Sequence, residues 1–200
     1  RGLGQTDKPD RSYTMADYAA DAEGLLQVVG WDTCAVIGIS FGGMVAQEFA
    51  LQYPSRVGRL VLGCTSSGGE GGASYPLQEL AQLSAEDWAK RVVELSDKRR
   101  FAAWQAAHPQ EFQALIDEML AIRTLGANEP GKVIGARRQI EARQGHATYS
   151  RLPQLTMPVL ICGGRYDGIA PVENQKALLR QISSARMALF EGGQAGPPEE

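Results

Sequence analysis

The sequence predicts an α/β fold, in which a mostly parallel sheet is flanked by helices. Three short and almost continuous apolar runs, at 34–39, 57–63 and 158–163, are typical of strands buried on both faces of such a sheet. Segments with helical spacing follow these runs, and the alternation of strand and helix favours parallel pairing. Residues 77–145 show helical periodicity alone, which predicts a helical block inserted between the second and third strands.

The first half of the chain carries clear start and stop signals for two helices. Thr14 and Asp17 form a capping box ahead of apolar residues at helical spacing. Gly30 provides the stop, because glycine readily adopts the left-handed conformation that ends a helix. A second helix follows Ser40 and ends before Pro54, which cannot continue it.

The second half of the chain begins with a glycine- and serine-rich loop at 65–74. Ser84 is a good N-cap for the first helix of the inserted block. After the third strand, a helix is expected to open at Pro171, which suits a first helical turn, and to run to Ile182. Residues 186–191 then form a last strand.

The composition argues against several classes of protein. The 200 residues are 44% hydrophobic, which is enough for a substantial core, and the net charge is −3 without a basic stripe, so nucleic-acid binding is not expected. No apolar stretch approaches the length of a membrane span, so no membrane association is expected. No Cys/His spacing suggests a zinc site. The three cysteines lie in or beside apolar runs and are expected to be free thiols in a reducing, cytoplasmic compartment: Cys34, Cys64 and Cys162.

Residues 38–42 read Gly-Ile-Ser-Phe-Gly at the predicted junction of a strand and a helix. A turn this sharp would project Ser40 from its apex, and we expect Gly38 and Gly42 to be required because any Cβ there would collide with the neighbouring elements. The backbone N–H of Phe41 would lie at a helix N-terminus, where it could stabilise a developing oxyanion. The alternatives are an incidental serine in a glycine-rich turn or a phosphate-binding turn, although the P-loop lysine and the Gly-x-Gly-x-x-Gly spacing are both missing.

A serine hydroxyl needs a neighbouring base to take its proton, and the base needs an acid to orient it. Asp167 is the candidate acid, because it follows the strand that ends at Gly163 and precedes a helix. The carboxyl ends of parallel strands meet at one edge of a sheet, so Ser40 and Asp167 are expected at the same edge. The alternative is an ordinary aspartate in a helix-entry turn.

The sequence resembles the α/β-hydrolase superfamily in four segments that span the whole chain. These segments are the Arg-Gly-Leu-Gly-Gln-Thr-Asp-Lys-Pro start, the serine turn, the strand and loop that carry the acid, and the final strand: 1–9, 38–43, 158–167 and 186–193. The Gly-Gly-Met-Val-Ala-Gln run after Ser40 is most similar to 3-oxoadipate enol-lactonases and small esterases.

The resemblance implies a partial α/β-hydrolase fold with an inserted helical cap. Residues 1–74 and 151–200 would form the hydrolase core, without the first strands of the family, and residues 75–150 would form the cap. Ser40 would be the nucleophile, Asp167 the acid and Phe41 one oxyanion-hole donor, with no metal or organic cofactor.

Two departures from the family pattern bear on activity. In the family a histidine follows the Gly-Gly that ends the last strand, whereas Gln194 stands at that position here. Glutamine has no titratable nitrogen, and loss of the base from such a triad costs on the order of a million-fold in turnover. The family also places several strands, and the loop with the second oxyanion donor, ahead of the Arg-Gly-x-Gly segment. The strand at 34–39 is therefore expected to have an unpaired edge that invites pairing with another chain, and hence a homo-oligomer.

The chain contains two histidines, and both lie elsewhere in the sequence. His108 precedes Pro109 and is expected to cap a helix at the surface. His146 lies where the cap returns to the core, and could substitute for the missing base only by reaching both Ser40 and Asp167; the alternative is a structural histidine.

These observations together predict a serine hydrolase that cleaves small carboxylic esters or lactones through an acyl-enzyme on Ser40 and is impaired because the catalytic histidine is absent. One alternative is a non-catalytic small-molecule binder that keeps the pocket and has lost the chemistry. Others are a cofactor-free haloperoxidase and a C–C hydrolase, because the same triad serves both.

Overall fold

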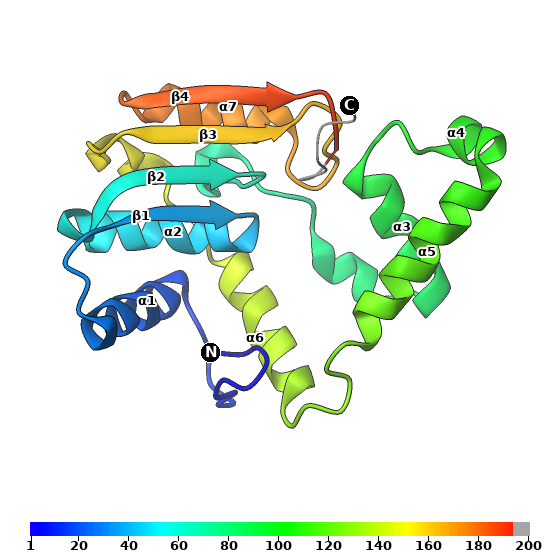
Figure 1. The fold of residues 1–200 in the computed structure, drawn as a ribbon, viewed down its shortest axis with the longest axis horizontal. Coiled ribbons are helices and arrows are strands. Elements are labelled where there is room, and N and C mark those ends of the chain that lie inside the picture. The colour runs from blue at the N-terminus through cyan, green and yellow to red at the C-terminus, as the bar shows by residue number, and fades with distance from the viewer. Residues whose placement is uncertain (194–200) are drawn as a thin grey trace.

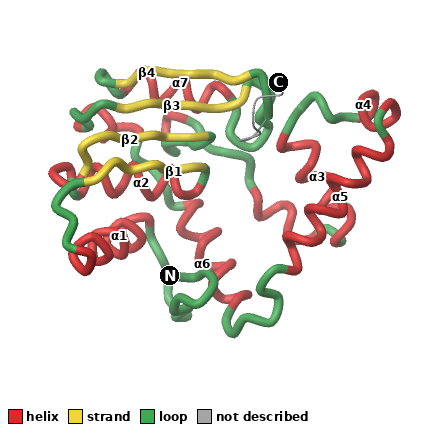
Figure 2. Tube along the Cα trace, in the orientation of Figure 1, coloured by secondary structure: helices red, strands yellow, loops and turns green. Residues whose placement is uncertain are grey.

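The computed structural model describes residues 1–193 and contains a sheet of four parallel strands in the order β1-β2-β3-β4. These strands are β1 (Cys34–Ile39), β2 (Val57–Gly63), β3 (Val159–Gly164) and β4 (Ala185–Phe190). All four point the same way, so their carboxyl ends share one edge of the sheet (Figure 1). Figure 2 shows the four strands side by side. The predicted α/β fold class is therefore confirmed.

Three helices pack with the sheet to form one layer beside it: α1 (Met15–Val29), α2 (Phe41–Gln52) and α7 (Val172–Gln181). Helices α2 and α7 pack on one face of the sheet, and α1 packs on α2 (Figure 1). The main core lies between the sheet and these helices, and its fully buried members include Leu60, Leu62, Ile161 and Leu178.

The helix ends follow their sequence signals closely. The Thr14 hydroxyl accepts from the Asp17 backbone N–H while the Asp17 carboxylate accepts from the Thr14 N–H, as a capping box requires. Gly30 ends α1 with φ at 69°, the left-handed conformation expected there. Pro171 is the N-cap residue of α7, so the helix begins at Val172, one position after the start expected from the sequence.

Four α-helices lie between β2 and β3: α3 (Ala85–Ser96), α4 (Ala102–Ala107), α5 (Pro109–Thr124) and α6 (Lys132–Gln144). Helices α3, α4 and α5 lie beyond the carboxyl edge of the sheet. Helix α6 lies below the sheet in this view, beside the N-terminal segment of the chain (Figure 1). The insertion therefore stands at the edge to which the candidate catalytic loops belong.

The second face of the sheet carries no helix among residues 1–193, so the expectation that the strands are buried on both faces was wrong. Ile37 is 69% exposed, Ile39 55% and Leu160 41%, and the strand register places all three on this face. Strand β1 pairs only with β2 in the described part of the chain, so its outer edge is unpaired, as the sequence predicted.

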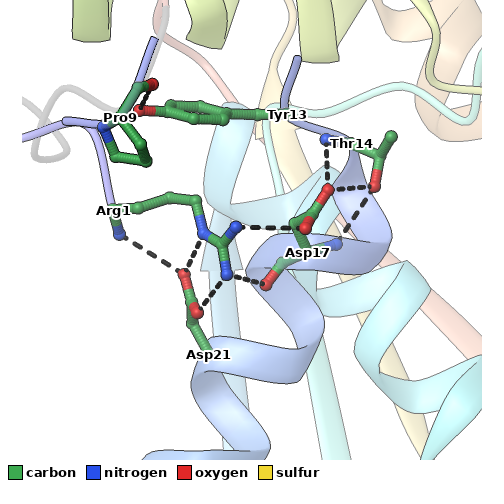
Figure 3. A network of polar contacts seen from close by, with 6 residues as sticks. All are labelled: Arg1, Pro9, Tyr13, Thr14, Asp17 and Asp21. Atoms are coloured by element: carbon green, nitrogen blue, oxygen red, sulfur yellow. Dashed lines mark hydrogen bonds and ion pairs between the residues drawn. The ribbon is translucent and has the colours of Figure 1, made fainter. Parts of the chain in front are cut away.

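The N-terminal segment is tied to two helices. Arg1 donates to the carboxylates of Asp17 and Asp21 on α1, and these charged hydrogen bonds hold the pKa of Asp21 below its ordinary value (Figure 3). Asp10 accepts from Arg137 and Arg138 on α6. The segment therefore links α1 to the last helix of the insertion.

Candidate active site

Ser40 occupies a sharp turn between β1 and α2. Its φ is 53° and its ψ −117°, a conformation that is costly for any residue with a Cβ. The Ser40 N–H donates to the Gly63 carbonyl at 2.8 Å, and the Ser40 carbonyl accepts from the Gly43 N–H at 3.0 Å and from the Thr65 hydroxyl at 2.8 Å. The surrounding backbone thus holds the strained turn that the sequence pattern predicted.

Two glycines beside the turn are required by close contacts, but they are not the pair expected from the sequence. A Cβ at Gly38 would collide with the Gly42 carbonyl oxygen and would lie 2.6 Å from the Ala46 Cβ. A Cβ at Gly43 would lie 2.6 Å from the Thr65 Cβ. A Cβ at Gly42 would meet nothing within 4 Å, so the expected need for glycine at that position was wrong.

Phe41 is the first residue of α2. Backbone N–H groups in a first helical turn have no acceptor within the helix and carry its positive partial charge. The Phe41 ring packs edge-on against Tyr18, with ring centroids 5.1 Å apart, which fixes this residue beside the turn. The Phe41 N–H therefore lies at the N-terminus of α2, directly after Ser40.

Asp167 lies in the loop that follows β3 and is fully buried. Its Oδ1 accepts from the backbone N–H groups of Ile169 and Ala170, at 2.7 and 2.8 Å. Its Oδ2 has no hydrogen-bond partner among residues 1–193. Burial raises the pKa of this carboxyl, while the two backbone donors and the Cys64 thiol act against that rise. A buried oxygen without a partner is costly, and an acid that orients a base needs one such free oxygen.

The Asp167 loop is held by the end of α3 and by the chain after β4. The Gly168 N–H donates to the Leu95 carbonyl, and the Tyr166 N–H donates to the Gly192 carbonyl. A Cβ at Gly193 would collide with the Ser96 carbonyl oxygen, so these segments are in close contact. Gln194 lies outside the described residues.

The end of β2 lies between the serine turn and the acid loop. Gly63 accepts from Ser40, and the next residue, Cys64, donates its N–H to the Cys162 carbonyl on β3. The two candidate catalytic residues consequently flank one strand at the same edge of the sheet, as expected for partners in one site.

The family model for the alpha/beta hydrolase fold matches residues 1–196. The chain belongs to the α/β-hydrolase fold family. The resemblance inferred from the four sequence segments is thereby confirmed.

Curated relatives of this α/β-hydrolase chain include several hydrolases. A poly(3-hydroxyalkanoate) depolymerase of Ectopseudomonas oleovorans is 27% identical over 192 residues, which cover 96% of this chain and 65% of the depolymerase. A 2-hydroxy-6-oxononadienedioate/2-hydroxy-6-oxononatrienedioate hydrolase of Dechloromonas aromatica (strain RCB) is 29% identical, with coverage of 84% and 57%. The chain thus spans less than two thirds of the length of these two relatives.

Solved structures with a similar fold include the enol-lactonase from Burkholderia xenovorans LB400, with a TM-score of 0.72 and 18% identity over 97% of this chain and 71% of that one. Est816, described as an N-acyl homoserine lactone degrading enzyme, has a TM-score of 0.74 and 22% identity over 97% and 73% of the two chains. At these sequence identities, the structural similarity supports the fold alone.

Neither histidine of the hydrolase-fold chain bonds to Ser40 or Asp167. His108 is exposed, stacks on Trp104 and joins α4 to α5, in line with the expected surface role. His146 is buried, and its Nε2 lies 3.1 Å from the Ser66 carbonyl, while its Nδ1 has no partner in the described part of the chain. Burial lowers the pKa of His146 to about 4.

Sequence reasoning missed a buried polar network beneath the site. The Gln47 amide donates to the carbonyls of Gly43 and Ser66 and accepts from the Thr148 hydroxyl. The network joins the first turns of α2 to the loop after β2 and to the chain that leaves α6. A glutamine among the apolar residues of α2 was the available signal, because a buried amide needs partners.

The described residues contain no group of three or more His, Cys, Asp or Glu side chains that could hold a metal ion. None of the three cysteines, all of which lie within residues 1–193, forms a disulfide. Among the helices of residues 1–193, none combines the length and apolar character that a membrane span needs.

Proposed function

We propose that this chain belongs to a serine hydrolase of small carboxylic esters or lactones that forms an acyl-enzyme on Ser40. The observation that carries the proposal is the strained Ser40 turn at the carboxyl edge of the sheet, one strand away from the buried Asp167. The hydrolase names of the curated relatives support the reaction class.

The mechanism assigns one task to each residue. The Ser40 hydroxyl attacks the acyl carbon, and the Phe41 N–H stabilises the oxyanion that forms on the carbonyl oxygen. A base must take the serine proton, and the free Oδ2 of Asp167 would orient that base and stabilise its charged form. The base then gives this proton to the departing alcohol oxygen as the acyl C–O bond breaks. Water hydrolyses the acyl-enzyme, which releases the acid and restores the Ser40 hydroxyl. In this assignment residues 75–150 cover the site as a cap.

The chain with Gln194 is proposed to be impaired, because glutamine cannot accept the serine proton. The test measures p-nitrophenyl butyrate hydrolysis by the chain as it stands, by Gln194→His and by both proteins with Ser40→Ala. We expect Gln194→His to gain a Ser40-dependent rate of at least about a hundredfold, since general-base catalysis contributes that much or more.

A fluorophosphonate probe gives a second readout, because it labels an activated serine without requiring turnover. Intact mass should show one label on Gln194→His and none on its Ser40→Ala counterpart. If Gln194→His shows neither Ser40-dependent cleavage nor labelling, the proposed hydrolase function is wrong. A Ser40-dependent rate in the chain with Gln194 would contradict the impairment alone.

C–C bond hydrolysis is a second candidate, favoured by the 29% identity to the 2-hydroxy-6-oxononadienedioate hydrolase of Dechloromonas aromatica. A panel of esters, lactones and β-diketones, applied to Gln194→His, separates the two reactions by their products.

A further inference from the structure

A cavity of about 250 Å³ lies beside the first turn of α2, between the loop after β2 and the end of α6. Its polar lining comes from both sides, with Ser66, Ser74 and Gln78 on the loop side and Arg143 and His146 on the other. Neither Ser40 nor Asp167 lines it. The volume is below the roughly 300–1,000 Å³ of typical small-molecule sites, so it suits a small ligand or one end of a larger one.

Arg143 brings an uncompensated positive charge to this cavity. Its guanidinium is partly buried and donates to the Tyr75 carbonyl at 2.7 Å, but it has no carboxylate partner among residues 1–193. The neighbouring arginines of α6 differ, since Arg137 and Arg138 both pair with Asp10. Burial without a counter-charge lowers the pKa of Arg143. A partly desolvated cation of this kind favours a bound anion, and guanidinium geometry favours a carboxylate.

His146 and Gln78 bring two acceptors that lack donors. Because the His146 Nε2 faces the Ser66 carbonyl, that nitrogen carries the proton and the Nδ1 presents a lone pair. Neither this Nδ1 nor the Gln78 Oε1 has a partner in the described part of the chain, although His146 is only 6% exposed. Buried acceptors are usually satisfied, so both call for a ligand that donates a hydrogen bond.

We propose that this cavity binds a small hydroxycarboxylate, with the carboxylate at Arg143 and the hydroxyl donating to His146 or Gln78. The inference goes beyond the proposed function, because neither Ser40 nor Asp167 lines the cavity. The ligand therefore already carries its free carboxylate and its free hydroxyl when it binds.

The test is calorimetric titration of the 200-residue chain with 3-hydroxybutyrate, alongside butyrate and 1,3-butanediol. Butyrate lacks the hydroxyl and the diol lacks the carboxylate, so both should bind at least about tenfold more weakly, because a hydrogen bond to a charged or buried group is worth that much. Equal affinity for all three, or no saturable heat from 3-hydroxybutyrate, overturns the proposal.

Matched variants locate the binding. Arg143→Met should weaken 3-hydroxybutyrate binding by about tenfold or more, whereas Arg137→Met, on an exposed arginine of the same helix, should leave it unchanged. Gln78→Leu should reduce the preference for 3-hydroxybutyrate over butyrate. Equal loss in Arg143→Met and Arg137→Met contradicts the assignment. If Arg143→Met fails to fold, the ligand comparison on the unchanged chain still decides.

The two proposals fail separately. The titration needs no turnover, so binding is measured whether or not Gln194→His hydrolyses an ester. Loss of hydrolysis with intact selective binding contradicts the reaction, and intact Ser40-dependent hydrolysis without selective binding contradicts the cavity assignment.

Discussion

Acidification below pH 6.5 should destabilise this chain through His146. Burial lowers the pKa of His146 in the folded chain to about 4, from an ordinary value of 6.5. The charged groups that act on it are Glu48, which raises its pKa, and Arg151, which lowers it. Between these two pH values, the His146 imidazole is therefore protonated in the unfolded chain and neutral in the folded chain.

The size of the effect follows from those two numbers. Above pH 7.5 the imidazole is neutral in both states, so His146 adds no pH dependence. Below pH 6.5 the unfolded state gains a proton, and the free energy of unfolding falls by about 1.4 kcal/mol per pH unit. The cumulative loss is about 2 kcal/mol at pH 5, and it levels off below pH 4 because the folded state is then protonated too.

Urea unfolding at pH 8, 6.5 and 5 measures this loss, with His146→Gln as the test variant and His108→Gln as the control at the exposed histidine. Asp167 acts in the opposite direction, because its raised pKa adds stability as the pH falls. The comparison therefore uses the difference between the unchanged chain and His146→Gln. If that difference stays constant from pH 8 to pH 5, the reasoning is wrong.

Three further changes have clear expected outcomes. Gly38→Ala should lower the free energy of unfolding by about 2 kcal/mol or more, because the new Cβ collides with backbone. Gly42→Ala should raise the free energy of unfolding by up to about 1 kcal/mol, because the new Cβ has space and alanine favours a helix. Equal effects of the two changes in urea unfolding would contradict these contacts. Asp167→Asn should raise the free energy of unfolding at pH 7 by about 1 kcal/mol, because it removes a buried charge and keeps the Oδ1 acceptor. A lower melting temperature of the variant would contradict this reasoning. Ile37→Lys should reduce self-association of the chain, because it places a charge on the exposed apolar face of the sheet. The free energy of unfolding should change by less than about 0.5 kcal/mol. Light scattering after size exclusion measures the association, and an unchanged mass would exclude the open sheet face as its cause.

Local signals predicted the elements of the fold well. The Thr14 capping box, the Gly30 stop and the apolar runs all mark elements that the structure contains. The serine turn was also predictable, because a strand, a glycine-flanked serine and a helix leave few backbone paths between them.

Long-range contacts account for the errors. The apolar run of β1 could not show that residues 1–193 place no helix on one face of the sheet, because strand composition does not report what packs on the strand. The need for glycine falls on Gly43 rather than Gly42 because of Thr65, which belongs to a loop after the next strand. The cavity was equally hidden, since Gln78 and Arg143 are far apart in sequence.

The Ser40 turn has a consequence for how this scaffold tolerates change. The hydrogen bonds that hold the bend are made by the backbone N–H and carbonyl of Ser40. Their partners are the backbone of Gly43, Met44 and Gly63 and, as the one side chain among the described residues, Thr65. Any L-amino acid with a small side chain at position 40 inherits the same bend and the same conformational cost. Reactivity at this point can thus be deleted or exchanged, with alanine, cysteine or aspartate, while the architecture stays in place.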